Sequence, residues 1–121
     1  MKIYYGRAIY DKREINAVNK VLKNNSLKLI DGKYVKLLEN KIAKLFGKKY
    51  ALMVNSGSSA NLLALASFNF KPGSEIITTT LTFSTTVAPI YQLGLIPSFI
   101  DVIKDKFIAD ISQIEKCITK K

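Results

Sequence analysis

Two short polar stretches carry the residues of this sequence that could take part in chemistry. Residues 55–61 read Asn-Ser-Gly-Ser-Ser-Ala-Asn and stand between a short apolar run and a run rich in Leu and Ala. Residues 80–86 read Thr-Leu-Thr-Phe-Ser-Thr-Thr and follow a run of β-branched residues. Short apolar runs bounded by turns are typical of buried parallel strands, whereas Leu and Ala favour helices. Each polar stretch therefore stands where a predicted strand ends and a predicted helix begins.

The first stretch, residues 55–61, predicts a binding site for a phosphate group. Ser56 or Ser58 can cap the helix, whose start presents free backbone N–H groups and the positive end of the helix dipole. The N–H groups around Gly57, Ser58 and Ser59 need an acceptor, and at the carboxyl end of a strand a phosphate suits them. The alternative is that Ser56 merely caps a helix, and so short a motif does not decide between the two.

The second stretch, residues 80–86, places an aromatic ring among hydroxyl side chains. Open α/β sheets bind ligands at the carboxyl ends of their strands, so Phe83 is expected at the same edge as the phosphate site. A flat aromatic face beside a phosphate site suits a planar aromatic cofactor that carries a phosphate. The alternative is that Phe83 belongs to the hydrophobic core, as an isolated Phe usually does.

The rest of the chain supplies the elements that position these stretches. After an irregular arm, Asp11 and Glu14 form a predicted capping box at the start of one helix, and a second amphipathic helix ends at Gly47. Strands are predicted over residues 50–54, 75–79 and 97–102, and further helices over residues 84–93 and 110–118. Strands that alternate with helices predict an α/β fold with a parallel sheet covered on both faces.

Composition excludes several classes of protein. The 121 residues suffice for one domain, and no apolar run approaches the roughly 18–20 residues of a membrane span, so no membrane partner is expected. The N-terminus lacks a signal-peptide core, and Cys117 is the one cysteine, so a cytoplasmic location is predicted. Because the sequence has no His, it excludes His-based metal sites and Ser-His or Cys-His catalysis within this chain.

The net charge of +10, from 19 basic and 9 acidic residues, raises nucleic acid as a partner. The basic residues are nearly all Lys, however, with Arg7 and Arg13 as the two arginines, and the lysines recur among apolar residues of the predicted helices. This spacing favours the solvated faces of Lys-rich helices. Reading of bases usually relies on Arg and aromatic residues in a recognisable module, and none is found, so we expect no nucleic-acid partner.

The chain resembles the DegT/DnrJ/EryC1/StrS family of pyridoxal-phosphate-dependent sugar aminotransferases and dehydrases. Motifs in matching order and spacing cover about residues 10–121, at residues 32–39, 54–65, 71–78, 81–83 and 94–102. The Ser-Ser-Ala-Asn after the glycine, and Thr85 and Thr86 after Phe83, resemble most the branch that removes the 3-hydroxyl of nucleotide-linked 4-keto-6-deoxyhexoses. The resemblance implies an α/β fold, namely the N-terminal part of the large domain of a fold-type I pyridoxal-phosphate-dependent transferase, truncated.

The resemblance also implies roles for four residues. Gly57, Ser58 and Ser59 would bind the phosphate of pyridoxal 5′-phosphate or pyridoxamine 5′-phosphate, with backbone N–H groups at Ser58 and Ser59 as donors, and Phe83 would stack on the pyridine ring. A nucleotide-linked keto-sugar is the implied substrate. The full-length enzyme is expected to be a homodimer.

The chain departs from the family in length, because family members run to several hundred residues. The acidic partner of the pyridine nitrogen, and the Schiff-base lysine or the histidine that replaces it, lie later in the family. Lys71, Lys104 and Lys121 do not fit the lysine motif, so no catalytic residue is assigned. Residues 1–48 are expected to form an arm and two helices, and residues 49–121 the first βα units of an incomplete cofactor-binding domain.

We therefore expect an N-terminal fragment of a pyridoxal-phosphate-dependent nucleotide-sugar aminotransferase or 3-dehydrase of deoxysugar, lipopolysaccharide or surface-polysaccharide biosynthesis, inactive and poorly stable alone. The sequence does not choose between amination and dehydration. One alternative is a non-catalytic binding module for a phosphate-bearing small molecule. The other, with less support, is a basic nucleic-acid-binding domain.

Overall fold

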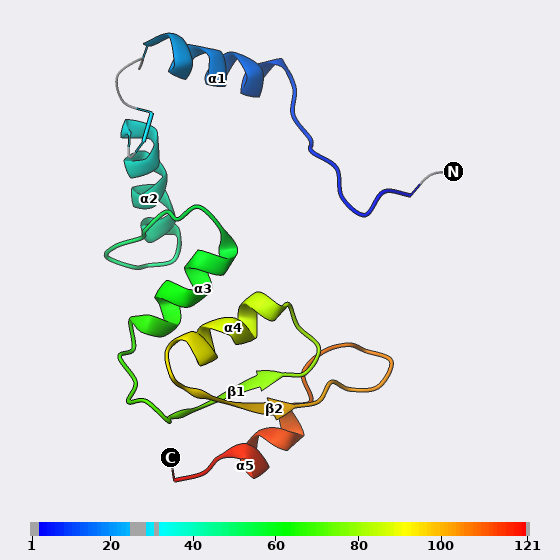
Figure 1. Ribbon diagram of the computed structural model, residues 1–121. Helices are drawn as coiled ribbons and strands as arrows, with labels where there is room; N and C mark the ends of the chain where they lie inside the picture. Colours follow the sequence, from blue (N-terminus) through cyan, green and yellow to red (C-terminus); the bar gives the residue numbers. More distant parts are fainter. Residues whose placement is uncertain (1–2, 25–28, 31, 121) are drawn as a thin grey trace. The chain divides into compact units, whose positions relative to one another are not determined.

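The structure, a computed structural model, describes residues 3–24, 29–30 and 32–120. The chain divides into two compact units, Met1–Met53 and Val54–Lys121, which we call the first and second unit. The described residues form, in chain order, α1 (Lys12–Asn24), α2 (Lys33–Leu45), α3 (Gly57–Ala66), β1 (Glu75–Thr79), α4 (Ser84–Gln92), β2 (Ile96–Ile100), the 3₁₀ helix η1 (Ile111–Gln113) and α5 (Ile114–Cys117) (Figure 1).

The first unit contains the arm, α1 and α2. Of the predicted arm, Met1 and Lys2 lie outside the described residues, and residues 3–10 form neither helix nor strand. The predicted capping box at α1 is confirmed, since the Asp11 N–H donates to the Glu14 carboxylate at 2.8 Å and the Arg13 N–H donates to Asp11 Oδ1 at 2.7 Å. Hydrogen bonds from the side chain and backbone of Arg13 lower the pKa of the Asp11 carboxyl group.

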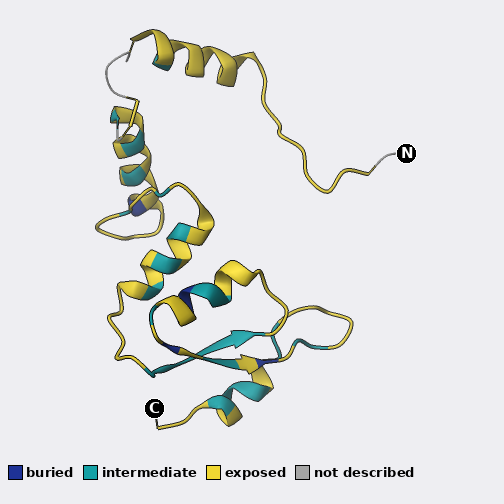
Figure 2. Cartoon of the chain, viewed as in Figure 1, coloured by how far each residue is buried: buried dark blue, intermediate teal, exposed yellow. Residues whose placement is uncertain are grey.

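The helix α2 ends at Leu45, and Gly47 follows its C-cap residue Phe46, where the sequence predicts a terminating glycine. Gly47 has φ of 61°, the Gly47 N–H donates to the Lys44 carbonyl at 3.1 Å, and the Lys48 N–H donates to the Ala43 carbonyl at 2.8 Å. These two bonds form a Schellman motif, which requires the left-handed conformation that glycine adopts without strain. Ala43 is the one buried residue of α2, and α1 has none (Figure 2).

The second unit is built around two parallel strands. β1 and β2 pair in register from Glu75 opposite Ile96 to Thr79 opposite Ile100. The chain enters β1 through a turn in which Gly73 has φ of 84° and the Ser74 N–H donates to the Lys71 carbonyl at 3.0 Å. Both α4 and α5 contact β2, and they lie on opposite sides of the strand pair (Figure 1). The predicted α/β fold with parallel strands is confirmed.

The core of the second unit lies between α4 and the strands. Its buried hydrophobic residues in the described part of the chain are Ile90 of α4, Leu95, which precedes β2, and Ile100 of β2. The predicted helix over residues 84–93 is confirmed as α4, and Gly94, with φ of 68°, follows its end. The α4 helix therefore connects β1 to β2 across one side of the strand pair, as in a βαβ unit.

The predicted strand over residues 50–54 is wrong. These residues form no regular secondary structure, and Tyr50 and Leu52 are 77% and 73% exposed. A strand needs a neighbour to satisfy its backbone groups, and among the described residues β1 and β2 pair with each other alone. The Met53 N–H instead donates to the Glu39 carboxylate of α2, at 2.9 Å.

The last two predicted elements differ from the structure at their ends. The strand predicted over residues 97–102 begins one residue earlier, at Ile96, and ends at Ile100, because Val102 turns to form an antiparallel bridge with Ala109. The helix predicted over residues 110–118 begins as η1, capped by the Asp110 carboxylate, and ends as α5 at Cys117. Within the described ranges, no helix combines the length and the apolar character needed to cross a membrane.

Candidate functional site

Ser56 caps the helix α3, which settles the choice between Ser56 and Ser58. Ser56 has the extended backbone of an N-cap, with φ of −161° and ψ of 160°, and its Oγ accepts the Ser59 N–H at 3.1 Å. The Ser59 hydroxyl donates to Asn55 Oδ1 at 2.6 Å, which ties the turn to the first turn of the helix. These side chains therefore fix the direction in which α3 begins.

The capping leaves two backbone donors at the start of α3 without an acceptor. Neither the Gly57 N–H nor the Ser58 N–H donates a hydrogen bond to any described residue, and the Ser58 hydroxyl forms none either. A Cβ added to Gly57 would meet no atom within 4 Å, and Gly57 and Ser58 are both exposed, so the start of α3 is accessible. Two free N–H groups, a hydroxyl and the positive end of the helix dipole together fit a phosphate group.

The structure assigns the N–H of Ser59 a different role from those of Gly57 and Ser58. The family resemblance implies backbone donors at Ser58 and Ser59, but the Ser59 N–H already donates to Ser56 Oγ. A phosphate oxygen at Ser59 would have to share this hydrogen atom with the Ser56 hydroxyl oxygen. We therefore regard Gly57 and Ser58 as the stronger donors of the predicted site.

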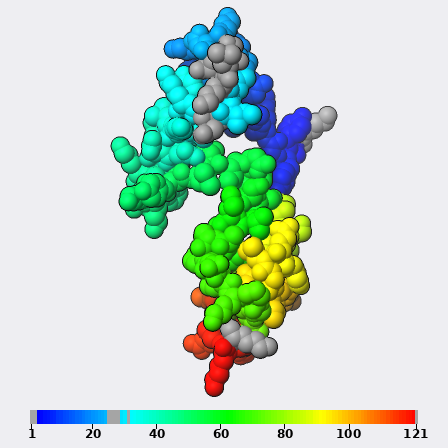
Figure 3. Space-filling view, turned by 60° about the vertical axis from the view of Figure 1, so that its left-hand side comes forward, coloured from blue at the N-terminus to red at the C-terminus, as the bar shows by residue number. Residues whose placement is uncertain are grey.

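The start of α3 lies beside α4 and borders a small hollow. Figure 3 shows α3, in green, directly beside α4, in yellow, and the two helices are in contact. The hollow between them has a volume of about 180 Å³. Its lining comes from both helices, namely Ser58, Ser59, Leu62, Thr85, Ala88, Pro89 and Gln92. Two of the four predicted site residues, Ser58 and Ser59, therefore meet Thr85 here.

Sequence reasoning missed Gln92 and the α4 side of this hollow. Residues 85, 88, 89 and 92 follow the i, i+3, i+4, i+7 spacing of one helix face, so the signal was present in the sequence. Pro89 also lies inside α4 and has no N–H to donate to the Thr85 carbonyl four residues earlier. The hollow thus combines the hydroxyl-bearing residues Ser58, Ser59 and Thr85 with the amide-bearing Gln92.

Phe83 lies at the start of α4, outside the hollow of Ser58 and Ser59. It is the N-cap residue of α4, and its carbonyl accepts the Thr86 N–H at 2.9 Å. Its side chain is 76% exposed and lines, with Leu81 and Thr82, an open hollow of about 460 Å³. Phe83 therefore does not belong to the core of the described unit, and its ring face is accessible to a ligand.

The described residues offer these hollows no acid–base group and no metal ligands. No group of three or more His, Cys, Asp or Glu residues in the described ranges could hold a metal ion. No lysine and no carboxylate lines the hollow at Ser58 or the one at Phe83. The groups present fit a phosphate at Ser58 and an aromatic ring at Phe83, but the lining residues supply no group that titrates near neutral pH.

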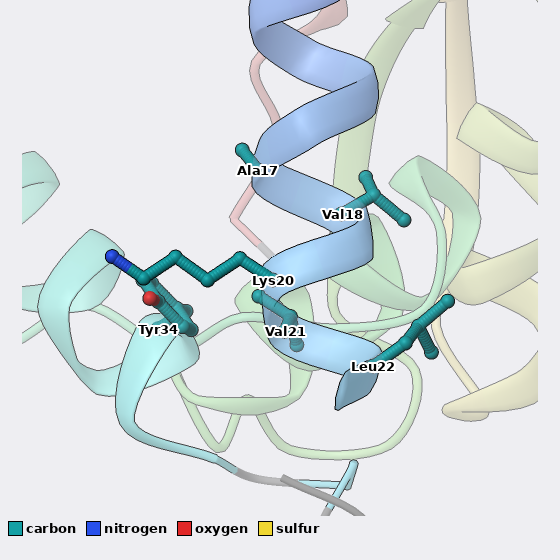
Figure 4. Close-up of a pocket in the computed structure, with 6 residues that line it drawn as sticks. All are labelled: Ala17, Val18, Lys20, Val21, Leu22 and Tyr34. Carbon is teal, nitrogen blue, oxygen red and sulfur yellow. The ribbon is translucent and has the colours of Figure 1, made fainter. Parts of the chain in front are cut away.

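The first unit has a different hollow, between α1 and α2. It has a volume of about 480 Å³, and Figure 4 shows its lining side chains, which are Ala17, Val18, Lys20, Val21, Leu22 and Tyr34. Lys20 and Tyr34 supply its two polar side-chain ends. An apolar hollow with no convergent set of polar groups assigns no chemistry, so we place the candidate site in the second unit.

The positive charge of the chain also belongs to the first unit. Residues 1–53 hold 13 basic and 4 acidic residues, or +9, whereas residues 54–121 hold 6 and 5, or +1. The lysines of α1 and α2 are exposed, as expected of solvated helix faces. The predicted phosphate site at α3 therefore offers N–H groups and the helix dipole rather than a cluster of lysines.

Comparison with known proteins gives the same family that the motifs suggest. The model of the DegT/DnrJ/EryC1/StrS aminotransferase family matches residues 8–121. GDP-4-keto-6-deoxy-D-mannose 3-dehydratase of Yersinia pseudotuberculosis is 36% identical over 118 residues, which are 93% of this chain and 30% of that protein. The spore coat polysaccharide biosynthesis protein SpsC of Bacillus subtilis is 33% identical over 95% of this chain and 29% of its own length.

Solved structures agree with this assignment. The GDP-4-keto-6-deoxy-D-mannose-3-dehydratase of E. coli, with bound hydrated pyridoxal phosphate, superposes with a TM-score of 0.84 and 38% identity. The superposition covers 94% of this chain and 30% of that one. The chain thus spans about three tenths of the length of the relatives it matches, and the predicted fold, that of a pyridoxal-phosphate-dependent transferase, is confirmed.

Proposed function

This chain belongs to the DegT/DnrJ/EryC1/StrS aminotransferase family, and we propose that its second unit binds pyridoxal 5′-phosphate or pyridoxamine 5′-phosphate. The observation that carries the proposal is the start of α3, where the N–H groups of two exposed residues, Gly57 and Ser58, have no acceptor in the described structure. When bound, this cofactor supplies an electron sink for breaking bonds beside the carbon that carries the amine.

Each predicted site residue has a distinct part in this proposal. Gly57 and Ser58 donate their N–H groups to phosphate oxygens, and the Ser58 hydroxyl adds a third donor. Ser56 and Asn55 do not contact the phosphate and fix the turn that aims these donors. Phe83 presents its exposed ring to the face of the pyridine ring, which restricts the orientation of the cofactor.

We propose that the complete protein acts on a nucleotide-linked keto-sugar, as a 3-dehydratase or an aminotransferase. The relatives named GDP-4-keto-6-deoxy-D-mannose 3-dehydratase support the first reaction, and the family description supports the second. A homodimer is the proposed assembly of the complete enzyme. The present chain contributes cofactor-binding groups, and the group that moves protons during the reaction must come from residues beyond these 121.

The second candidate is a binding module that holds a phosphate-bearing molecule without reacting with it. The lack of any lysine or carboxylate in the lining of the two hollows of the second unit favours it for this chain taken alone. A completed chain distinguishes the two candidates. In it, residues 8–121, which the family model matches, replace the corresponding segment of the E. coli dehydratase. Turnover by the completed chain supports the enzyme, whereas cofactor binding without turnover supports the module.

In this completed chain, we expect Phe83→Ala to weaken cofactor binding by about 3- to 10-fold, because an aromatic pair contributes about 0.5–1.5 kcal/mol beyond area burial. The melting temperature without cofactor should hardly change, since the ring is 76% exposed. Truncating a core Phe would instead cost about 3–5 kcal/mol of stability. Titration with pyridoxal phosphate, followed by absorbance, and a thermal melt of the cofactor-free protein measure the two effects.

Phe68→Ala is the matched control. Phe68 lies just past the C-terminal end of α3, away from Ser58, and stacks on Phe70 with a centroid distance of 5.3 Å. Because Phe68 is also largely exposed, at 67%, we expect this variant to leave both the melting temperature and the cofactor affinity nearly unchanged. A Phe83→Ala protein that loses apo stability but keeps its affinity would assign Phe83 to the core and contradict its proposed role.

A further inference from the structure

Asp101 forms the side-chain hydrogen bond that links the segments just after the carboxyl ends of the two strands. The last paired residues are Thr79 of β1 and Ile100 of β2, so Thr80 and Asp101 stand opposite each other one position beyond the sheet. The Thr80 hydroxyl donates to Asp101 Oδ1 at 3.2 Å, and the Thr80 N–H donates to the Ile100 carbonyl at 3.0 Å. Both polar donors of Thr80 are therefore held by the end of β2.

The position of Asp101 is itself fixed by the segment that follows. Its N–H donates to Gln113 Oε1 at 3.0 Å, and its carbonyl accepts the Asp110 N–H at 2.9 Å. The Val102 N–H donates to Asp101 Oδ1 at 2.7 Å, which orients the carboxylate toward Thr80. Gln113 Nε2 in turn donates to Asp110 Oδ2 at 2.8 Å. The position of Asp101 is thus restrained, and its Oδ1 accepts hydrogen bonds both from Val102, which follows β2, and from Thr80, which follows β1.

Thr80 begins the four-residue loop that ends at Phe83. Along this loop the Thr79 hydroxyl donates to the Leu81 carbonyl at 3.2 Å, and the Thr82 hydroxyl donates to Thr86 Oγ1 at 3.1 Å. The other end of the loop is fixed by the start of α4, where Phe83 accepts the Thr86 N–H. With both ends held, the loop has little freedom, and the first of its anchors is the hydrogen bond to Asp101.

We infer that Asp101 is a positioning residue for Phe83, acting through Thr80 to fix the loop that carries the aromatic ring toward the cofactor. This inference rests on the proposed function in so far as the ring faces a cofactor. Asp101 lines neither hollow of the second unit and so contacts no proposed cofactor atom itself. A carboxylate suits this role because hydrogen bonds to a charged acceptor are stronger than those between neutral groups.

The first test does not require a cofactor. Hydrogen–deuterium exchange of the cofactor-free completed chain, followed by mass spectrometry, reports on the amides of residues 80–83, among which the Thr80 N–H is hydrogen-bonded to the Ile100 carbonyl. Loss of one net hydrogen bond should speed their exchange roughly five- to ten-fold. We expect this acceleration in Thr80→Val, which removes the donor, and in Asp101→Ala, which removes the acceptor. Asp101→Asn keeps an acceptor oxygen and should restore slow exchange.

Two controls make the exchange result specific. The double variant Thr80→Val with Asp101→Ala should be no faster than Asp101→Ala alone, because both changes remove the same bond. Glu115→Ala removes a negative charge on α5. Because the Glu115 side chain forms no hydrogen bond in the described structure, this variant should leave the exchange of the loop unchanged. The inference is overturned if the amides of residues 80–83 in the wild-type protein exchange at the rate of an unstructured peptide. It is also overturned if these amides exchange as slowly in Thr80→Val as in the wild type.

The second test measures the effect on the ring. In the completed chain loaded with pyridoxal phosphate, Thr80→Val should weaken cofactor affinity about threefold and change the circular dichroism of the bound cofactor, which depends on how the aromatic ring lies against it. A general loss of stability would not produce such a spectral change. If the parent completed chain does not bind the cofactor, the proposed function fails and the exchange experiment still decides the anchoring. If it binds and Thr80→Val leaves affinity and spectrum unchanged, the inference fails alone.

Discussion

We expect the 121-residue chain to give no turnover of a GDP-linked 4-keto-6-deoxyhexose, even when it is supplied with pyridoxal or pyridoxamine phosphate. Chemistry on this cofactor needs a positioned lysine or histidine to carry the amine or move protons. The chain has no His, and no lysine lines the hollow at Ser58 or at Phe83. Mass spectrometry of the sugar nucleotide before and after incubation measures the conversion.

The completed chain serves as the positive control for this prediction, because it regains the residues that lie beyond the present segment. We expect it to convert the substrate under the conditions in which the 121-residue chain does not. Conversion by the 121-residue chain itself, above that of a heat-treated sample, would contradict the assignment of catalysis to residues outside it. Replacement of each lysine of the second unit by Met would then identify the group responsible.

A second large effect is expected in the stability of the chain alone. We expect it to bind a hydrophobic dye, to elute at a size that grows with concentration, and to lose its circular dichroism over a broad temperature range. The buried hydrophobic residues of the described chain are Ala43, Ile90, Leu95 and Ile100, whereas large apolar side chains such as Tyr50, Leu52 and Phe107 are more than 70% exposed. So small a core offsets little of the entropy lost on folding.

The exposed strand edges add to this expectation. The two strands pair with each other in the described chain, so each has an outer edge with unpaired backbone groups. Such edges and apolar patches promote association and aggregation. Analytical ultracentrifugation with a thermal melt tests the prediction, with the completed chain as a control that melts cooperatively. A sharp, concentration-independent melt of a monomer would contradict it.

Local features of this fold could be predicted from the sequence because neighbouring residues determine them. The capping box of Asp11 and Glu14 and the cap at Ser56 depend on side chains within three residues of the N–H groups they satisfy. Gly47 and Gly94 end their helices because they adopt positive φ without strain. The strand over residues 75–79 was predicted with the bounds that β1 has.

Features that depend on distant residues could not be predicted in the same way. Residues 50–54 have the composition of a strand, but a strand forms where a partner is present, and composition carries no information on pairing. Spacing alone indicates that residues 85, 88, 89 and 92 share one face of α4, but it does not indicate that α3 packs against that face and forms the hollow at Ser58 with Gln92. The roles of Ser58, Ser59 and Phe83 toward a cofactor come from the family resemblance and from the free donors, and they remain predictions.

The central claim is that the start of α3 binds the phosphate of the cofactor. A crystal structure of the completed chain with pyridoxal phosphate tests it most directly. We predict phosphate oxygens at hydrogen-bond distance, roughly 2.7–3.2 Å, from the amide nitrogens of Gly57 and Ser58, with the Ser59 amide nitrogen still bonded to Ser56. A phosphate that lies more than about 4 Å from the amide nitrogens of Gly57, Ser58 and Ser59 would contradict the claim.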